Sequence, residues 1–512
     1  MRAQHLFVVA MAALLATTSV RASVEINANP TKNMNCSAGV CAPTAKNAVL
    51  NTTDLANMLA TSDVKVMTGS GAVTITVSGS FSWTSAHRLT LDAYYNVSFR
   101  APVVVAGQGA VTITTNDGGT GGDLIFFPGA KLDFWDTSSS LTINGNDYTL
   151  EGDLKALAEG VRANLYGRLA LVRDEDLATH GQYKASPVKP WFGGIFEGLG
   201  HTIDHLVIKD DHRGNCGLFK HTAGGGVLRD ITLAHVDISG RDGVGALVGN
   251  SNGSIFNSSA SGVVRGGAYV GGLAGTMFTT MANSSAAVSV YGGWGTRETL
   301  GPVGGLVGNA SGTIMRSHST GDVNGGAYVT LGSLVGNAAS RLHISESYAT
   351  GSVTSAEVRT SAGGFVGLGS YATIENSYSL GSVTTNLDTQ IGGFIGGTPS
   401  DITIKTSYST GMVTSGSKNI DHIRRKIFLG GFVGRDTADS RDVTDAYWDL
   451  DTSGVTDPAQ GAGNIKNDPG ITGLTDAQLK SGLPAGFDPN IWGQNPSINN
   501  GYPYLLNNPP PR

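Results

Sequence analysis

The sequence predicts an all-β protein, a right-handed parallel β-helix with coils of about 20 to 30 residues and short helical caps or insertions. Three observations predict this solenoid. A glycine-rich phrase recurs along the chain, a serine-rich phrase follows each copy, and 73 of 512 residues are glycine. Charged residues make up 14% of the chain, against about 25% in average domains. Few charges and many small residues are typical of short strands joined by tight turns.

The glycine phrase reads GGLVG at residues 304–308. The last glycine of this phrase returns at intervals of roughly 30 residues, at Gly249, Gly275, Gly308, Gly336, Gly367, Gly396 and Gly434. Glycine weakens an isolated strand, so its regular return indicates a tight corner or a close approach between neighbouring coils. We therefore predict that Gly304, Gly305 and Gly308 are needed where one coil packs on the next.

The serine-rich phrase places an aromatic residue at one repeat position, in Tyr348, Tyr378 and Tyr408, with His318 one unit earlier. Equivalent residues of stacked coils lie about 4.8 Å apart, so these side chains form a ladder. An outward ladder would be an aromatic platform for sugar rings, whereas an inward ladder would be core. Packing is the favoured interpretation, and ligand binding by the three tyrosines is the alternative.

The segments before the repeats divide at residue 150. Residues 1–22 are predicted to be a signal peptide, with a basic start, an apolar run and a small-residue cleavage site. Residues 23–45 are polar and are expected to be loosely held. Residues 46–150 are predicted to be an N-terminal β-helix with a capping helix, for which Thr53 or Asp54 is the candidate N-cap.

The remaining chain is predicted to form a connector, a repeat region and a cap. Residues 151–190 are the connector, with a short helix after Asp153, and residues 191–434 are the repeat β-helix. Residues 435–512 break the repeat and are expected to close the last coil with five side chains, Trp448, Trp492, Tyr502, Tyr504 and Leu505. A single coil cannot bury enough apolar surface to fold alone, so both ends need caps.

The three cysteines predict one disulfide and no zinc site. Cys36 and Cys41 can pair in an oxidising compartment, and Cys216 is expected to be a buried, unreactive thiol. No paired C-x-x-C spacing is present. We predict no metal and no cofactor.

The bulk properties exclude several partners. A net charge of −6 over 512 residues gives no electrostatic footprint for nucleic acid. The basic run at residues 422–426 is interpreted as a solvated loop. No segment after the signal peptide has 18 consecutive apolar residues, so the sequence predicts no transmembrane helix.

A polysaccharide-cleaving β-helix is the main enzymatic rival, and it needs acidic residues that converge from adjacent coils. The best candidates are Asp210, Asp211, His212 and Arg213, although a turn also favours such residues. His201 and His205 would lie about 13 Å apart on a straight strand. A metal site there would need partners from neighbouring coils.

The glycine phrase followed by the Ser-Tyr phrase resembles the GLUG repeat of bacterial secreted proteins of the filamentous haemagglutinin type. The resemblance covers roughly residues 195–507. It implies a large β-helical surface molecule associated with adhesion. GLUG repeats also resemble segments outside the catalytic region of some IgA-specific metalloendopeptidases. No His-Glu pair occurs in this sequence, so the H-E-x-x-H zinc site of such enzymes is absent.

We therefore expect an exported, extracellular or cell-surface, non-enzymatic repeat protein, with a periplasmic location as an alternative. Its expected role is that of an adhesin, or of a protein that contacts a host or matrix glycan or protein. A polysaccharide lyase or hydrolase and a passive stalk are the alternative functions. The two strand regions form either one continuous β-helix or two that are joined at residues 151–190.

Overall fold

The computed structural model describes residues 23–69, 72–210, 214–294, 301–339, 341–358, 360–387, 390–416, 427–437 and 441–511. The predicted signal peptide (residues 1–22), the basic run at residues 422–426, and Asp211, His212 and Arg213 lie outside these ranges.

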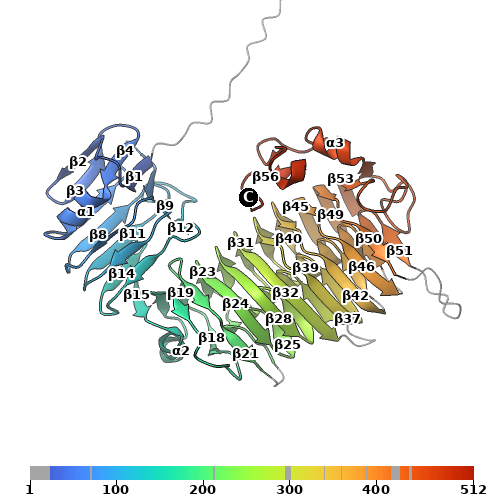
Figure 1. Ribbon diagram of the computed structural model, residues 1–512, viewed down its shortest axis with the longest axis horizontal. Coiled ribbons are helices and arrows are strands. Elements are labelled where there is room, and N and C mark those ends of the chain that lie inside the picture. Colours follow the sequence, from blue (N-terminus) through green and yellow to red (C-terminus); the bar gives the residue numbers. More distant parts are fainter. Residues whose placement is uncertain are drawn as a thin grey trace, which may run out of the picture.

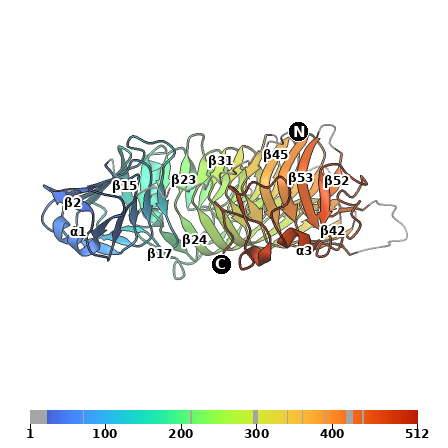
Figure 2. The ribbon, with the colours of Figure 1, turned by 90° about the horizontal axis from the view of Figure 1, so that it is seen from above.

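The chain is a β-solenoid of about 14 turns of parallel strands, which confirms the predicted fold class. Figure 1 shows two strand stacks that meet at an angle near α2 (Leu154–Ala163). From above, the stacks form one elongated body (Figure 2). Each stack has its own hydrophobic core. The strand regions are therefore two joined stacks rather than one uniform helix.

The first stack has three faces. One sheet comprises β1 (Ser23–Asn27), β4 (Ala48–Asn51), β6 (Thr74–Val77), β9 (Val97–Phe99) and β12 (Leu124–Phe126). The second comprises β7 (Phe81–Trp83), β10 (Val103–Val105) and β13 (Leu132–Phe134). The third is formed by β3 (Val40–Pro43), β5 (Val64–Met67), β8 (Arg88–Asp92), β11 (Ala110–Thr114) and β14 (Ser140–Ile143), with β2 (Met34–Ser37) paired to β3.

The N-terminal segment differs from the expectation of a loosely held chain. β1 pairs in parallel with both β4 and β6, and Val24 and Ile26 are fully buried. The segment Ser23–Asn27 has only five residues, with apolar side chains at every second position. It forms a strand because β4 and β6 pair with it on its two sides. The capping helix α1 (Thr52–Leu59) is present, but its N-cap is Asn51, two or three residues before the predicted N-cap at Thr53 or Asp54.

Two hairpins interrupt the parallel order. Ala38 and Gly39 join β2 to β3, and Asn144 and Gly145 join β14 to β15 (Asn146–Glu151); all four residues have positive φ. This conformation suits two-residue hairpin loops, in which Asn-Gly is strongly preferred. Since β14 and β15 are antiparallel, strand direction reverses at this hairpin. The ladder continues from β14 through β15 to β16, so the two stacks are joined at this face but differ in strand direction.

The second stack also has three faces. The nine-stranded face comprises β18 (Val188–Phe192), β22 (Phe219–Thr222), β26 (Val248–Ser251), β30 (Ala274–Met277), β34 (Val307–Ala310), β39 (Val335–Ala338), β44 (Val366–Gly369), β48 (Ile395–Thr398) and β52 (Val433–Asp436). The seven-stranded face comprises β25 (Asp242–Val244), β29 (Ala268–Gly271), β33 (Gly301–Gly304), β38 (Val329–Gly332), β43 (Ser361–Gly363), β47 (Gln390–Gly392) and β51 (Phe428–Gly430).

The third face carries the serine-rich phrase. Its strands before residue 300 are β15, β16 (Arg168–Leu171), β17 (Glu175–Asp176), β19 (Ile195–Glu197), β20 (Thr202–Asp204), β21 (Val207–Lys209), β23 (Val227–Arg229), β24 (Thr232–Ser239), β27 (Ser254–Phe256), β28 (Ser259–Gly266), β31 (Thr280–Ala282) and β32 (Ser285–Trp294). After it come β35 (Thr313–Met315), β36 (His318–Ser319), β37 (Val323–Ala327), β40 (His343–Ser345), β41 (Tyr348–Ala349), β42 (Val353–Val358), β45 (Ala372–Ser379), β46 (Val383–Leu387), β49 (Ile402–Ser409), β50 (Val413–Ser415), β53 (Arg441–Asp449) and β54 (Ile471–Leu474).

The glycine phrase forms a corner between two faces. Gly304 ends β33, and Gly308 is the second residue of β34. A Cβ on Gly304 would lie 2.0 Å from the Val307 carbonyl oxygen, and a Cβ on Gly305 would lie 2.0 Å from the Ser333 carbonyl oxygen of the next coil. Real Cβ atoms do not approach backbone so closely, so in this coil neither position accepts a side chain unless the backbone shifts.

The C-terminal region does more than close the last coil. Trp448 packs in the hydrophobic core at the C-terminal end of the second stack. Beyond it, α3 (Asp476–Lys480), β55 (Trp492–Gly493), the 3-10 turn η1 (Asn499–Gly501) and β56 (Tyr504–Leu505) return along the side of the stack. In Figure 1 the chain end lies near β31 and β40, several coils back. The expected cap is therefore also a lateral cover.

Glu151 ends β15 at the boundary between the stacks, and its side chain packs against Gly160 of α2. Burial, with Asp153 and Glu159 nearby, raises the pKa of Glu151 to about 7. The unfolded carboxyl titrates near pH 4.3, so the folded chain binds more protons between these values and loses stability as pH rises through them.

Glu151→Gln is therefore expected to raise the free energy of unfolding above pH 7 by on the order of 2–3 kcal/mol, with no gain at pH 4. Thermal melts of both proteins at pH 4 and pH 8 measure this difference. An equal effect of the substitution at the two pH values would contradict the assignment.

Candidate functional site

An open groove of about 600 Å³ crosses the second stack over the last residues of β24, β28 and β32 and the first residues of β37. Its floor is a run of glycines at one repeat position, here called the glycine ladder: Gly240, Gly266, Gly292 and Gly325. Strand register places Gly266 opposite Gly292 and Gly292 opposite Gly325. The groove is therefore a property of the repeat, extended over successive coils.

Core packing explains the glycine ladder. A Cβ on Gly292 would lie 2.1 Å from Cγ2 of Val303, and one on Gly325 would lie 2.4 Å from Cδ2 of Leu331. The apolar core thus reaches up to the backbone at this corner and leaves no room for side chains. One coil later Ser355 takes the equivalent position, opposite Gly325, and the groove lining ends.

The residue before each glycine points outward and forms the rim. Ser239, Arg265, Tyr291 and Asn324 occupy this position in four successive coils. The Tyr291 side chain is 43% exposed, and the Arg265 guanidinium carbon lies 5.4 Å from the centre of its ring. Arg265 is held from the other side by Asp237, at 2.8 Å. An exposed ring beside a fixed guanidinium offers both a stacking face and planar hydrogen-bond donors.

The three tyrosines of the predicted ladder do stack, with ring centroids 4.9 Å apart for Tyr348 and Tyr378 and 5.2 Å apart for Tyr378 and Tyr408. They face away from the coil interior, because the neighbouring Ser379 turns inward to donate to the Gly393 carbonyl, at 2.8 Å. None of the three rings has exposed surface.

The C-terminal segment covers this ladder. It contributes a group of apolar side chains that pack on the rings: Leu479, Phe487, Trp492, Tyr502 and Leu505. The hydroxyl of Tyr408 donates to the Pro503 carbonyl at 2.6 Å, and Asn508 reaches His318 at 3.1 Å. The proposed sugar platform on Tyr348, Tyr378 and Tyr408 is thus filled by the chain itself, and a sugar could stack there only after this segment had left.

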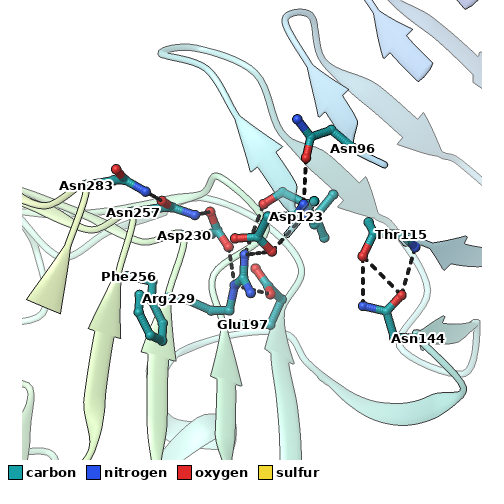
Figure 3. A network of polar contacts seen from close by, with 12 residues as sticks. Asn96, Thr115, Asp123, Asn144, Glu197, Arg229, Asp230, Phe256, Asn257 and Asn283 are labelled. Carbon is teal, nitrogen blue, oxygen red and sulfur yellow. Dashed lines mark hydrogen bonds and ion pairs between the residues drawn. The ribbon is translucent and has the colours of Figure 1, made fainter. Parts of the chain in front are cut away.

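A buried charge network, shown in Figure 3, joins the two stacks. The Nε atom of Arg229, in β23, lies 2.6 Å from a carboxylate oxygen of Asp230 and 3.2 Å from one of Glu197. The Nη2 atom of Arg229 lies 2.9 Å from Asp123, which directly precedes β12 of the first stack. The same Nη2 donates to the Leu124 carbonyl at 3.0 Å. Burial and the Asp230 charge raise the pKa of Glu197. Glu197 and Asp230 are each 2% exposed, so this paired carboxylate cluster is closed to a polymer substrate.

Of the acidic candidates from the sequence, only Asp210 lies within the described ranges. Asp210 is 9% exposed, and Asp211, His212 and Arg213 lie outside the described ranges. A different pair, Asp133 and Asp174, shares Lys131, whose Nζ lies 3.9 Å and 2.6 Å from the two carboxylates. Burial raises the pKa of Asp133; burial acts on Asp174 too, but hydrogen bonds from His201 and Lys131 hold its pKa well below the usual range.

The histidines separate into different environments. His201 is fully buried and bonds the Leu132 carbonyl at 3.0 Å across the boundary of the stacks. His221 stacks on the exposed Trp191, with ring centroids 4.4 Å apart. His205 stacks on His235 of the neighbouring coil, with ring centroids 5.2 Å apart. Sequence spacing within one strand could not find this pair, because its members lie 30 positions apart in the chain.

The cysteines occupy the expected places. Cys36 and Cys41 face each other across the β2–β3 hairpin and are joined by a disulfide. Cys216 is fully buried, and burial raises the pKa of its thiol to about 12. A thiol that stays protonated at neutral pH is a poor nucleophile and a poor metal ligand.

No helix among the described residues is long and apolar enough to span a membrane. Two solved structures share a general likeness with the chain. One, named as an immunoglobulin A1 protease of Bacteroides ovatus, is 16% identical with a TM-score of 0.39, over 70% of this chain and 92% of that one. The other, an IgA1 protease, is 18% identical with a TM-score of 0.43, over 59% of this chain and 25% of that one.

A relative by sequence is halomucin of Haloquadratum walsbyi, which is 28% identical over 219 residues. The matched stretch is 40% of this chain but 2% of halomucin, so the chain spans a small part of that protein's length. Residues 359–384 match the family model described as the GLUG motif. A GLUG motif is therefore present in the repeat region, at the coil that contains β43, β44 and β45.

Proposed function

We propose that this chain is an exported, non-enzymatic β-solenoid, similar to filamentous haemagglutinin-like adhesins, that contacts extracellular glycan through the groove over the glycine ladder. The observation that carries this proposal is the half-exposed Tyr291 ring, fixed beside Arg265 in an open groove. The signal-peptide pattern and the GLUG motif at residues 359–384 support export and a repetitive surface role.

The groove chemistry favours a sugar chain with acidic groups. A flat aromatic face packs against the apolar face of a sugar ring, and an arginine binds a carboxylate through two parallel donors. Arg241 lines the groove together with Arg265, and Asp242 and Asn324 add acceptors and an amide. Because the groove is open and crosses several coils, it suits an extended polymer rather than a small enclosed ligand.

Tyr291→Ala is expected to weaken binding to an acidic polysaccharide by about tenfold or more, which corresponds to the loss of about 1.4 kcal/mol. The full chain is screened on a glycan array, and the best ligand is titrated by calorimetry. Tyr291→Phe should retain binding because it keeps the ring.

Tyr371→Ala is the matched control, since Tyr371 is 56% exposed and does not line the groove. Equal loss of affinity in the Tyr371 and Tyr291 variants, or no binding by the wild-type chain, would contradict the proposal.

A polysaccharide-cleaving enzyme is the second candidate, and the opposed pKa shifts of Asp133 and Asp174 favour it. Lys131 between the two carboxylates would supply the basic partner that such an enzyme needs. Against it, Asp174 also accepts from the Thr202 backbone and bonds the buried His201, which are structural contacts between neighbouring coils of the second stack. A fall in polymer viscosity on incubation with the chain, abolished by Asp174→Asn in a folded protein, would establish the enzyme instead.

A further inference from the structure

Two histidines and two aspartates from three successive coils meet on the surface of the second stack. Asp176 ends β17, and Asp204 ends β20 and pairs in register with it. His205 follows Asp204 directly, and His235 lies one coil further on, in β24. The backbone N–H of His205 donates to the Ala234 carbonyl at 3.0 Å. The parallel ladder thus fixes the spacing of the three coils, independently of the side chains.

Both histidines sit at the same bend of the coil. His205 has φ 56° and His235 has φ 47°, the left-handed conformation that few residues other than glycine adopt. Because the two backbones share this conformation, their side chains leave in the same direction. The rings accordingly stack, with centroids 5.2 Å apart and planes 20° apart.

The ligand atoms of the two rings converge on one carboxylate. Asp204 Oδ1 lies 2.8 Å from His235 Nδ1 and 3.3 Å from His205 Nδ1. One ligand atom from each of Asp204, His205 and His235 lies within 4.8 Å of the other two. Asp176 Oδ1 lies 2.9 Å from His205 Nδ1 and adds a second negative charge beside the group. Side-chain exposure is 45% for His205 and 69% for His235, so an ion can enter from solvent.

We propose that Asp204, His205 and His235 form a binding site for a divalent transition-metal ion, of which Zn²⁺ is the reference. Zinc bonds of about 2.0–2.2 Å place two donors at most about 4 Å apart. The present spacing of the three ligand atoms, within 4.8 Å of one another, is close to this range. Two imidazoles and a carboxylate suit Zn²⁺, Ni²⁺ or Cu²⁺ better than Ca²⁺ or Mg²⁺. Three protein donors leave a position for water or an outside ligand.

The alternative explanation of the same contacts is a set of His–carboxylate ion pairs without an ion. The chain offers a matched example of such a pair: His343 Nε2 lies 3.0 Å from Glu375 Oε1, with the two side chains 43% and 37% exposed. That pair has one imidazole and one carboxylate, and within the described part of the chain no third possible ligand joins it. A histidine that merely pairs with an acid should therefore behave like His343.

The test is equilibrium dialysis of the untagged full chain against micromolar Zn²⁺, together with the visible absorption of bound Co²⁺. Wild type and His343→Gln are expected to bind one ion per chain, and His235→Gln and Asp204→Asn to bind at least about tenfold more weakly. The Co²⁺ absorption should disappear in these two variants. Circular dichroism melts confirm that each variant is folded.

The site is refuted if the wild-type chain retains no Zn²⁺. It is equally refuted if His235→Gln and Asp204→Asn bind Zn²⁺ as tightly as His343→Gln, because binding would then come from histidines elsewhere in the chain.

Discussion

Gly304→Ala is expected to destabilise the second stack by about 3 kcal/mol or more, at the upper end of the cost of overpacking. The first glycine of the phrase is the same in all seven coils that carry it, at Gly245, Gly271, Gly304, Gly332, Gly363, Gly392 and Gly430. At Gly304 the added methyl would meet backbone on two sides, 2.0 Å from the Val307 oxygen and 2.6 Å from the Gly336 nitrogen. Backbone in a stacked ladder cannot move aside as a flexible side chain can.

Thermal melts followed by circular dichroism measure the effect, and Gly224→Ala is the control. Gly224 is exposed, and a Cβ there would have no neighbour within 4 Å. Gly305→Ala should cost less than Gly304→Ala, because two other coils carry Ala246 and Ser333 at the equivalent position. A melting temperature of Gly304→Ala equal to that of Gly224→Ala would refute the corner explanation.

Arg229→Met is expected to cost about 3–5 kcal/mol, since removing one partner of a buried ion pair leaves uncompensated charge. Glu197 and Asp230 would remain buried, and the link to Asp123 of the first stack would be lost. Carboxylates left without their cation take up protons more readily, so the deficit should shrink as pH falls toward 5. Melts of wild type and variant at pH 5 and pH 7.5 provide the comparison.

The neutral triple variant Arg229→Met, Glu197→Gln, Asp230→Asn separates the loss of charge balance from the loss of packing. It should recover most of the stability, because buried ion networks can be replaced at little cost when every charge is removed. If Arg229→Met alone melts like wild type at pH 7.5, the network does not hold the stacks together.

The fold could be predicted because the feature that determines it is repeated in the sequence. A single glycine such as Gly304 would not indicate that two backbones come close. The same glycine in coil after coil forms a periodic pattern, which can be recognised in one sequence without an alignment. The hairpin at Asn144 and Gly145 also had a local signal, since Asn-Gly favours positive φ at both positions. Its consequence, the reversal between two stacks, depended on pairing with strands distant in the chain.

The groove and the lateral cover were not predicted, for two different physical reasons. The glycine ladder is itself periodic in the sequence, at Gly240, Gly266, Gly292 and Gly325. This period is hard to recognise because the more regular glycine phrase recurs in the same coils. The burial of Tyr348, Tyr378 and Tyr408 has no local signal, because it depends on residues 475–508 folding back over five coils. Periodicity shows which residues share a face of the solenoid, but not what covers that face.

Hydrogen–deuterium exchange with and without the best polysaccharide ligand tests the central claim most directly. The account predicts slower exchange in residues 239–242, 265–267, 291–293 and 324–325, which line the groove, and unchanged exchange in residues 475–508. Protection that omits the groove, or faster exchange in the C-terminal segment as the tyrosine ladder is uncovered, would contradict it.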